Sequence, residues 1–418
     1  MYKKETLKSG LRVITEEIPY LRSASLGVWV ASGSRYEADG QEGISHFLEH
    51  LLFKGTQKRS AKEIAQAVDS VGGQLNAFTG KEYTCFYVKV LDEHLGLGLD
   101  ILADMYHSSL LEPGDIEKEK GVVLEEIKLY EDTPDELVHD LFARAIWGGN
   151  ALGRSILGTE ESVTSMNREK VRAYYADHFT PGNTVVAAAG HFKHAELVRM
   201  VEAAFRPLQG AGKQEQPAGP GEENRILVRP KDTEQVHLCL GTTGLPHDHP
   251  DIYALHVLNA CLGGGPSSRL FQEIREERGL AYSVYSYQNS YRDTGTVGIY
   301  AGMSPKYLGE VIKIAIRELS SLAEVALPDA ELVRAKEQLK GNLMLSLESS
   351  SSRMSQLGRS EVAREKVWTS DEMISEIERV TAEQVRRLAE TFSHRGKAMA
   401  LVGMVPDGLD LEGLLNGA

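Results

Sequence analysis

Residues 43–55 read Gly-Ile-Ser-His-Phe-Leu-Glu-His-Leu-Leu-Phe-Lys-Gly, and the rest of the chain is organised around this stretch. Its apolar residues recur at helical spacing, and Gly55 is a typical helix stop. On that helix His46, Glu49 and His50 share one face. Two imidazoles one turn apart suit Zn²⁺, and a carboxylate beside them can take a proton from a metal-bound water. A pair of core histidines without metal is the alternative, and a zinc site requires a third protein ligand.

Composition restricts the class of protein. The 418 residues are 42% hydrophobic and 25% charged, which is ordinary for soluble globular proteins and long enough for two or three domains. The net charge of −14 disfavours nucleic acid and anionic membranes as partners. No apolar run approaches the ~20 residues of a membrane span, and residues 1–7 lack the apolar region of a secretory signal. The three cysteines form no Cys-x-x-Cys motif and have apolar neighbours, so we expect a cytoplasmic protein.

The chain divides near its middle. Residues 210–224 are rich in Gly and Pro and lack periodicity, which predicts a linker between domains 1–209 and 225–418. Alternation and apolar runs predict the strands of the first domain at 11–15, 24–31, 74–79, 82–90 and 184–190. Helical periodicity predicts helices at 61–71, 92–110, 114–131, 135–147, 167–178 and 194–205.

The two halves resemble each other. A strand at 235–240 precedes His256 as the strand at 25–30 precedes His46, and helix 254–262 aligns with the motif helix. In this alignment Asn259 replaces Glu49 and Ala260 replaces His50, so only the first copy can bind metal. We therefore predict an α+β fold of two homologous domains, each a mixed, mostly antiparallel sheet flanked by helices.

A third ligand is sought on the predicted helix 114–131. Glu119 and Glu126 are two turns apart and lie on one face close to the apolar positions, whereas Glu125 lies on another face. Glu/Lys-rich helices are usually solvated, so periodicity leaves open whether this pair is functional or simply exposed.

Several motifs together resemble one family. They are His46-x-x-Glu49-His50, Gly121-Val-Val-Leu-Glu-Glu-Ile127, Gly72-Gly-Gln-Leu-Asn-Ala-Phe-Thr79, Gly263-Gly-Gly-Pro-Ser-Ser-Arg-Leu-Phe271 and Arg275-Glu-Glu-Arg-Gly-Leu-Ala-Tyr282. Over essentially its whole length the chain resembles the pitrilysin family of metallopeptidases, the inverzincins. Within that family it is similar to the mitochondrial processing peptidases and their bacterial relatives.

The resemblance implies a role for each matching residue of the metal site. His46, His50 and Glu126 would bind one Zn²⁺ per chain, Glu49 would be the general base, and Glu119 would orient a ligand histidine or support the site.

The resemblance also implies contacts to substrate. Asn76, Ala77 and Phe78 would form an exposed sheet edge that binds an extended peptide, whereas without the resemblance they read as an ordinary hairpin strand. Arg275 and Tyr282 would hold the peptide backbone and stabilise the oxyanion, although by themselves they read as a surface arginine and a core tyrosine.

The implied function is a zinc metalloendopeptidase that hydrolyses extended peptides or unfolded precursor segments, with a zinc-bound water activated by Glu49. Long members of the family carry four such domains and close around the peptide like a clamshell. Since this chain has two, we expect a homodimer, with Arg275 and Tyr282 acting in cis or in trans. The alternative is a non-catalytic peptide-binding or structural subunit of the same family.

Overall fold

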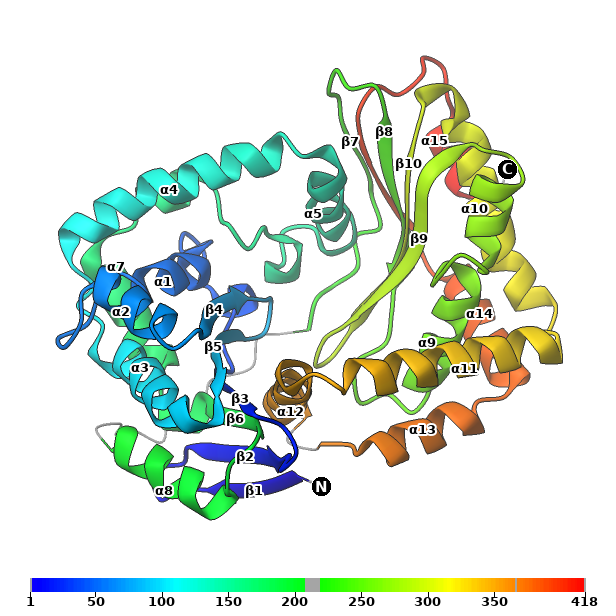
Figure 1. Ribbon diagram of the computed structural model, residues 1–418. Coiled ribbons are helices and arrows are strands. Elements are labelled where there is room, and N and C mark those ends of the chain that lie inside the picture. The colour runs from blue at the N-terminus through cyan, green and yellow to red at the C-terminus, as the bar shows by residue number, and fades with distance from the viewer. Residues whose placement is uncertain (1, 207–218, 365–366, 417–418) are drawn as a thin grey trace. The chain divides into compact units, whose positions relative to one another are not determined.

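The structure is a computed structural model that describes residues 2–206, 219–364 and 367–416 (Figure 1). The chain forms two compact units. The first unit comprises residues 1–128, 155–218 and 345–369, and the second unit comprises 129–154, 219–344 and 370–418. Residues 210–218 of the predicted linker lie outside the described residues.

A six-stranded mixed sheet organises the first unit. Its strands are β1 (Tyr2–Thr6), β2 (Arg12–Glu17), β3 (Ser23–Val30), β4 (Gln74–Thr79), β5 (Thr84–Leu91) and β6 (Thr184–Gly190). The spatial order is β1-β2-β6-β3-β5-β4, in which β2 and β6 run parallel and every other pair is antiparallel. β4 is therefore an edge strand, and the predicted strand at 82–90 begins only at Thr84 because a turn at Gly80 precedes it.

The helices of the first unit match predicted ranges, apart from those at 160–164 and 350–364, which no predicted range covers. They are α1 (Ile44–Leu52), α2 (Ala61–Asp69), α3 (Leu95–Ser108), α4 (Pro113–Glu131), α6 (Glu160–Thr164), α7 (Arg168–His178), α8 (His194–Ala204) and α12 (Ser350–Arg364). The predicted helix 92–110 is shorter in the structure, because residues Asp92–His94 form a separate 3₁₀ turn.

The second unit repeats the topology of the first. Its strands are β7 (Ile226–Arg229), β8 (Val236–Thr243), β9 (Ala281–Ser290), β10 (Gly295–Met303) and β11 (Ala398–Val402), in the order β7-β11-β8-β10-β9. As in the first unit, the first and last of these strands in the sequence pair in parallel and the remaining pairs are antiparallel. Taken in chain order, β7 to β11 occupy the same sheet positions as β2 to β6. The predicted fold of two homologous α+β domains is confirmed.

The helices of the second unit include a π-helical segment at Phe271–Glu276. The α-helices are α5 (Pro134–Trp147), α9 (Ile252–Leu262), α10 (Leu308–Glu324), α11 (Asp329–Ser346), α13 (Ser370–Arg379), α14 (Ala382–His394) and α15 (Leu411–Leu415). Among the described helices, none is both long and apolar enough to cross a membrane.

Two helices pack on the sheet of the other half of the sequence. Helix α5 comes from the first half but packs on β8 and β11, where Phe142 and Trp147 are buried in one cluster. Helix α12 comes from the second half but packs on β3 and β6. There the indole Nε1 of Trp29 lies 3.4 Å from the sulfur of Met354, and Gly358 leaves room for the indole ring. Each compact unit therefore combines residues from both sides of the predicted linker.

Candidate active site

Helix α1 carries the histidine motif, and the burial of its apolar residues sets which side chains face away from the core. Phe47 and Leu48 are fully buried in the core of the first unit, which leaves His46, Glu49 and His50 on the face directed away from that core. This predicted helix is confirmed at Ile44–Leu52.

The N-terminus of α1 is capped from upstream in the chain. No side chain at the N-cap residue Gly43 is available to cap it, and the Glu37 carboxylate accepts hydrogen bonds from the backbone N–H groups of Gly43 (2.8 Å) and Ser45 (2.9 Å). A carboxylate at this end of a helix is favoured by the helix dipole. Burial raises the pKa of Glu37 to about 7, although these hydrogen bonds act in the opposite direction. No motif in the sequence points to Glu37, because its contact with α1 depends on a chain reversal that has no periodic signal.

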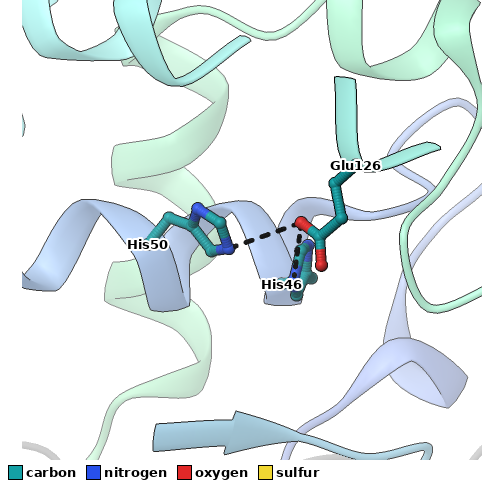
Figure 2. A group of neighbouring side chains, drawn as sticks. All are labelled: His46, His50 and Glu126. Carbon is teal, nitrogen blue, oxygen red and sulfur yellow. Dashed lines mark ion pairs between the residues drawn. The ribbon is translucent and has the colours of Figure 1, made fainter. Parts of the chain in front are cut away.

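The three predicted metal ligands, His46, His50 and Glu126, lie close together (Figure 2). One carboxylate oxygen of Glu126, on α4, lies 3.6 Å from Nε2 of His46 and 3.7 Å from Nε2 of His50. In the part of the chain that the structure describes, these residues form the one group of three or more His, Cys, Asp or Glu suited to hold a metal ion. The dashed lines in Figure 2 show the carboxylate facing both imidazole rings.

The spacing of these atoms fits zinc. Ligands about 2.0–2.1 Å from a tetrahedral ion lie about 3.4 Å from one another, close to the separations between Glu126 and the two imidazoles. Burial, and to a smaller extent the charge of His50, lower the pKa of His46 to about 4, which keeps its imidazole neutral and able to bind metal. Three protein ligands leave a fourth position open, as in catalytic zinc sites.

Glu119 supports this group from behind. Its carboxylate is buried, with one oxygen 3.2 Å from Nδ1 of His50 and the other 2.7 Å from the ammonium of Lys54. A hydrogen bond at Nδ1 directs Nε2 of the same ring toward the metal position. Lys54 was missed by the sequence analysis. It follows His50 by about one helical turn, but only the fold shows that it balances the charge of Glu119.

Glu49, on the same face of α1 as the two histidines, accepts a hydrogen bond and has a raised pKa. The hydroxyl of Thr79, the last residue of β4, donates to its carboxylate at 2.5 Å. Burial raises the pKa of Glu49 above its usual value, and the negative charge of Glu126 contributes in the same direction. A carboxylate with a raised pKa is a stronger base. Thr79 ends the motif 72–79, but nothing in the sequence indicates its hydrogen bond to Glu49.

The predicted substrate strand lies beside this glutamate. Asn76, Ala77 and Phe78 belong to β4, which pairs with β5 on one side only among the described strands. Glu125, by contrast, is exposed and pairs with Lys128, as its position on another face of α4 predicts.

Arg275 and Tyr282 lie next to each other in the second unit. The guanidinium carbon is 4.5 Å from the centre of the tyrosine ring, in a cation–π contact. Tyr282 is 76% exposed on β9, so the alternative of a core tyrosine is wrong. Their action on substrate stays a prediction.

The comparisons with known proteins show the family of the chain. Residues 12–160 match the family model described as Insulinase (Peptidase family M16), and residues 165–339 match the one described as Peptidase M16 inactive domain. The chain belongs to peptidase family M16. It is 46% identical to the uncharacterized zinc protease YmxG of Bacillus subtilis (strain 168), over 96% of this chain and 98% of that protein. It is 44% identical to an uncharacterized zinc protease of Streptomyces coelicolor, over 97% of this chain and 90% of that protein. The resemblance to the pitrilysin-like metallopeptidases is thus confirmed.

Solved structures share the M16 fold. A protease from Helicobacter pylori superimposes with a TM-score of 0.90 at 22% identity, covering 97% of this chain and 99% of that one. A chain of Complex III2 from Candida albicans gives a TM-score of 0.87 at 22% identity, covering 99% of each.

Removing the support behind His50 is expected to weaken zinc binding. Glu119→Ala should lower zinc affinity about 10- to 100-fold, because His50 loses the hydrogen bond that orients its ring. Glu125→Ala is the matched control on the same helix and should bind zinc as the wild type does. Competition with a chromophoric chelator measures both affinities. Equal affinity of Glu119→Ala and wild type would contradict this role.

The cap of α1 is expected to make stability depend on pH. Glu37 has a pKa of about 7 in the folded protein and 4.5 as its reference value, so between these values the folded state binds more protons. Its contribution to stability is therefore complete below 4.5 and is lost as pH rises through about 7. Glu37→Gln lacks this titration, so its free energy of unfolding relative to wild type should increase with pH across that window.

Urea denaturation of the metal-free proteins at pH values from about 4.5 to 7 measures this difference. Glu117→Gln, at an exposed position paired with Lys120, should keep the slope of the wild type. Parallel pH profiles of Glu37→Gln and wild type would show that Glu37 keeps an ordinary pKa in the fold.

Proposed function

We propose that this M16 protein is a zinc-dependent endopeptidase that hydrolyses extended peptides or unfolded precursor segments. The observation that carries the proposal is the convergence of His46, His50 and Glu126, beside the half-buried Glu49, whose pKa is raised. The names of its relatives as zinc proteases support it further.

The residues of the site divide the work. His46, His50 and Glu126 hold zinc, which when bound supplies Lewis-acid chemistry that lowers the pKa of water and polarises a carbonyl. Glu49 takes the proton of the attacking water and then returns it to the leaving amine. The hydrogen bond from Thr79 holds the carboxylate of Glu49 in one orientation.

The substrate is proposed to bind as an added strand. An edge strand presents unpaired backbone N–H and C=O groups, with which an extended peptide can form a ladder that demands little of its sequence. Residues Asn76, Ala77 and Phe78 of β4 offer this ladder next to Thr79 and Glu49. Folded substrates lack the free backbone that this mode requires, which favours extended or unfolded segments.

Catalysis by Glu49 can be tested directly. Wild type should cleave a quenched fluorescent peptide of about ten or more residues, lose activity with chelator and regain it with zinc. Glu49→Gln should bind zinc as wild type does but lose essentially all hydrolysis, because it has no base. Glu117→Gln should remain active. No cleavage by the zinc-loaded wild type across several unrelated peptides would instead favour a non-catalytic peptide-binding or structural subunit.

We further propose a cytoplasmic homodimer. The three cysteines are free and buried, which suits a reducing compartment. Arg275 and Tyr282 are proposed to hold the peptide and stabilise the oxyanion at the metal site of the partner copy. Their contact and the exposure of Tyr282 support this role, since a stacked and solvent-accessible pair can reach a ligand.

Mixing two inactive variants tests action in trans. Glu49→Gln protein and Arg275→Ala/Tyr282→Ala protein should each be inactive. A mixed dimer should have one intact site, and therefore about half of the activity of a wild-type dimer, which has two. Subunit exchange is verified by differently tagged copies. Absence of recovery in verified mixed dimers would show that the pair does not act in trans.

A further inference from the structure

The edge strand β4 has two faces with different surroundings. Because side chains alternate along a strand, Ala77 and Thr79 point to one face and Phe78 to the other. The first face is that of α1, since Ala77 packs against the core that contains α1 and Thr79 donates a hydrogen bond to Glu49. The second face is that of α12: Phe78 packs edge-on against Trp29 with ring centroids 5.5 Å apart, in the cluster that also contains Met354.

A positive charge stands on this second face. Arg359 of α12 is exposed, and its guanidinium carbon lies 5.9 Å from the centre of the Phe78 ring. Arg353, on the same helix, is different because its guanidinium forms an ion pair with Glu16 at 2.6 Å. Among the described residues no carboxylate pairs with Arg359. Its charge is therefore available to a ligand.

We propose that Arg359 selects an acidic side chain in the bound peptide. When an extended peptide adds to β4, the residue opposite Phe78 places its side chain on the α12 face, about 4.5–5.5 Å from Phe78 between Cβ atoms. A Glu or Asp at that position reaches the guanidinium, while its apolar stem contacts the aromatic ring. This inference rests on the proposed function, because it names the substrate class of the same site.

The overall charge makes such a preference informative. With a net charge of −14, the chain should repel acidic peptides in general. A gain from a carboxylate at one peptide position, with losses elsewhere, therefore indicates a local cation. Alternation also predicts that neighbouring peptide positions, which face α1, show no such gain.

The experiment uses one quenched peptide in which each position in turn is Glu, Gln or Lys. For the zinc-loaded wild type, Glu at the selected position should raise kcat/KM about two- to fivefold over Gln, the range for an exposed ion pair. Added salt should reduce this Glu-over-Gln ratio of kcat/KM. The corresponding Lys-over-Gln ratio should be below one. The Glu-over-Gln ratio should fall to about one in Arg359→Gln and persist in part in Arg359→Lys, whereas Arg359→Glu should favour Lys. The exposed Arg199 of α8, replaced by Gln, is the matched control and should keep the ratio of the wild type.

Binding of the same peptides to zinc-loaded Glu49→Gln protein, followed by fluorescence anisotropy, reads the preference without hydrolysis. A Glu-over-Gln preference in Kd that Arg359→Gln removes supports the inference even where cleavage is absent. If the wild type cleaves neutral peptides but no position shows a Glu preference that depends on Arg359, the inference is overturned and the proposed function stands. If no peptide is cleaved and none binds with such a preference, both are overturned.

Discussion

The packing of α1 and α4 against one core is the constraint on which the candidate metal site depends. Phe47 and Leu48 of α1 are fully buried in the same cluster as Ile116 and Val123 of α4. Because each helix turns a fixed apolar stripe to that core, the polar residues beside the stripe are brought to a fixed place. One carboxylate oxygen of Glu126 then lies 3.6 Å from His46 and 3.7 Å from His50, close to the separation of two ligands on a tetrahedral ion. A cavity in this core would shift all three ligands, so the packing of the core and the geometry of the site are one property.

Three carboxylates, two buried and one half-buried, lie on α1 or contact it, and each is stabilised differently. Burial of a charge is costly unless hydrogen bonds or an opposite charge offset it. Glu37 is held by the backbone N–H groups that begin α1, Glu119 by Lys54 and His50, and Glu49 by Thr79. The contacts of each carboxylate indicate what it can do. Glu37 caps the helix and Glu119 orients His50, whereas Glu49 has a raised pKa that suits proton transfer.

The duplicated fold serves two purposes. The second unit repeats the strand order of the first, but its α9 places Asn259 and Ala260 where the metal helix has Glu49 and His50. Its family model is accordingly described as an inactive domain. The fold is shared by a protease from Helicobacter pylori and by a chain of Complex III2 from Candida albicans, so architecture alone does not decide what this chain does. The intact donor set and its basic glutamate are the features of this chain that favour an enzyme.

The local features of the protein follow from short-range patterns in its sequence. Helical periodicity placed the histidine motif on α1 and put Glu119 and Glu126, but not Glu125, on the face of α4 close to its apolar positions. Both follow from the 3.6-residue repeat, which acts over a few turns of one helix. The matched order of strands likewise predicted the duplicated sheet.

Which residues from distant segments meet depends on the tertiary packing. The exchange of α5 and α12, the contact of Thr79 with Glu49 and the position of Arg359 beside Phe78 join segments far apart in the chain. Such contacts depend on how helices and strands pack and on the direction of each side chain. Neither quantity has a period that could be read along a single chain.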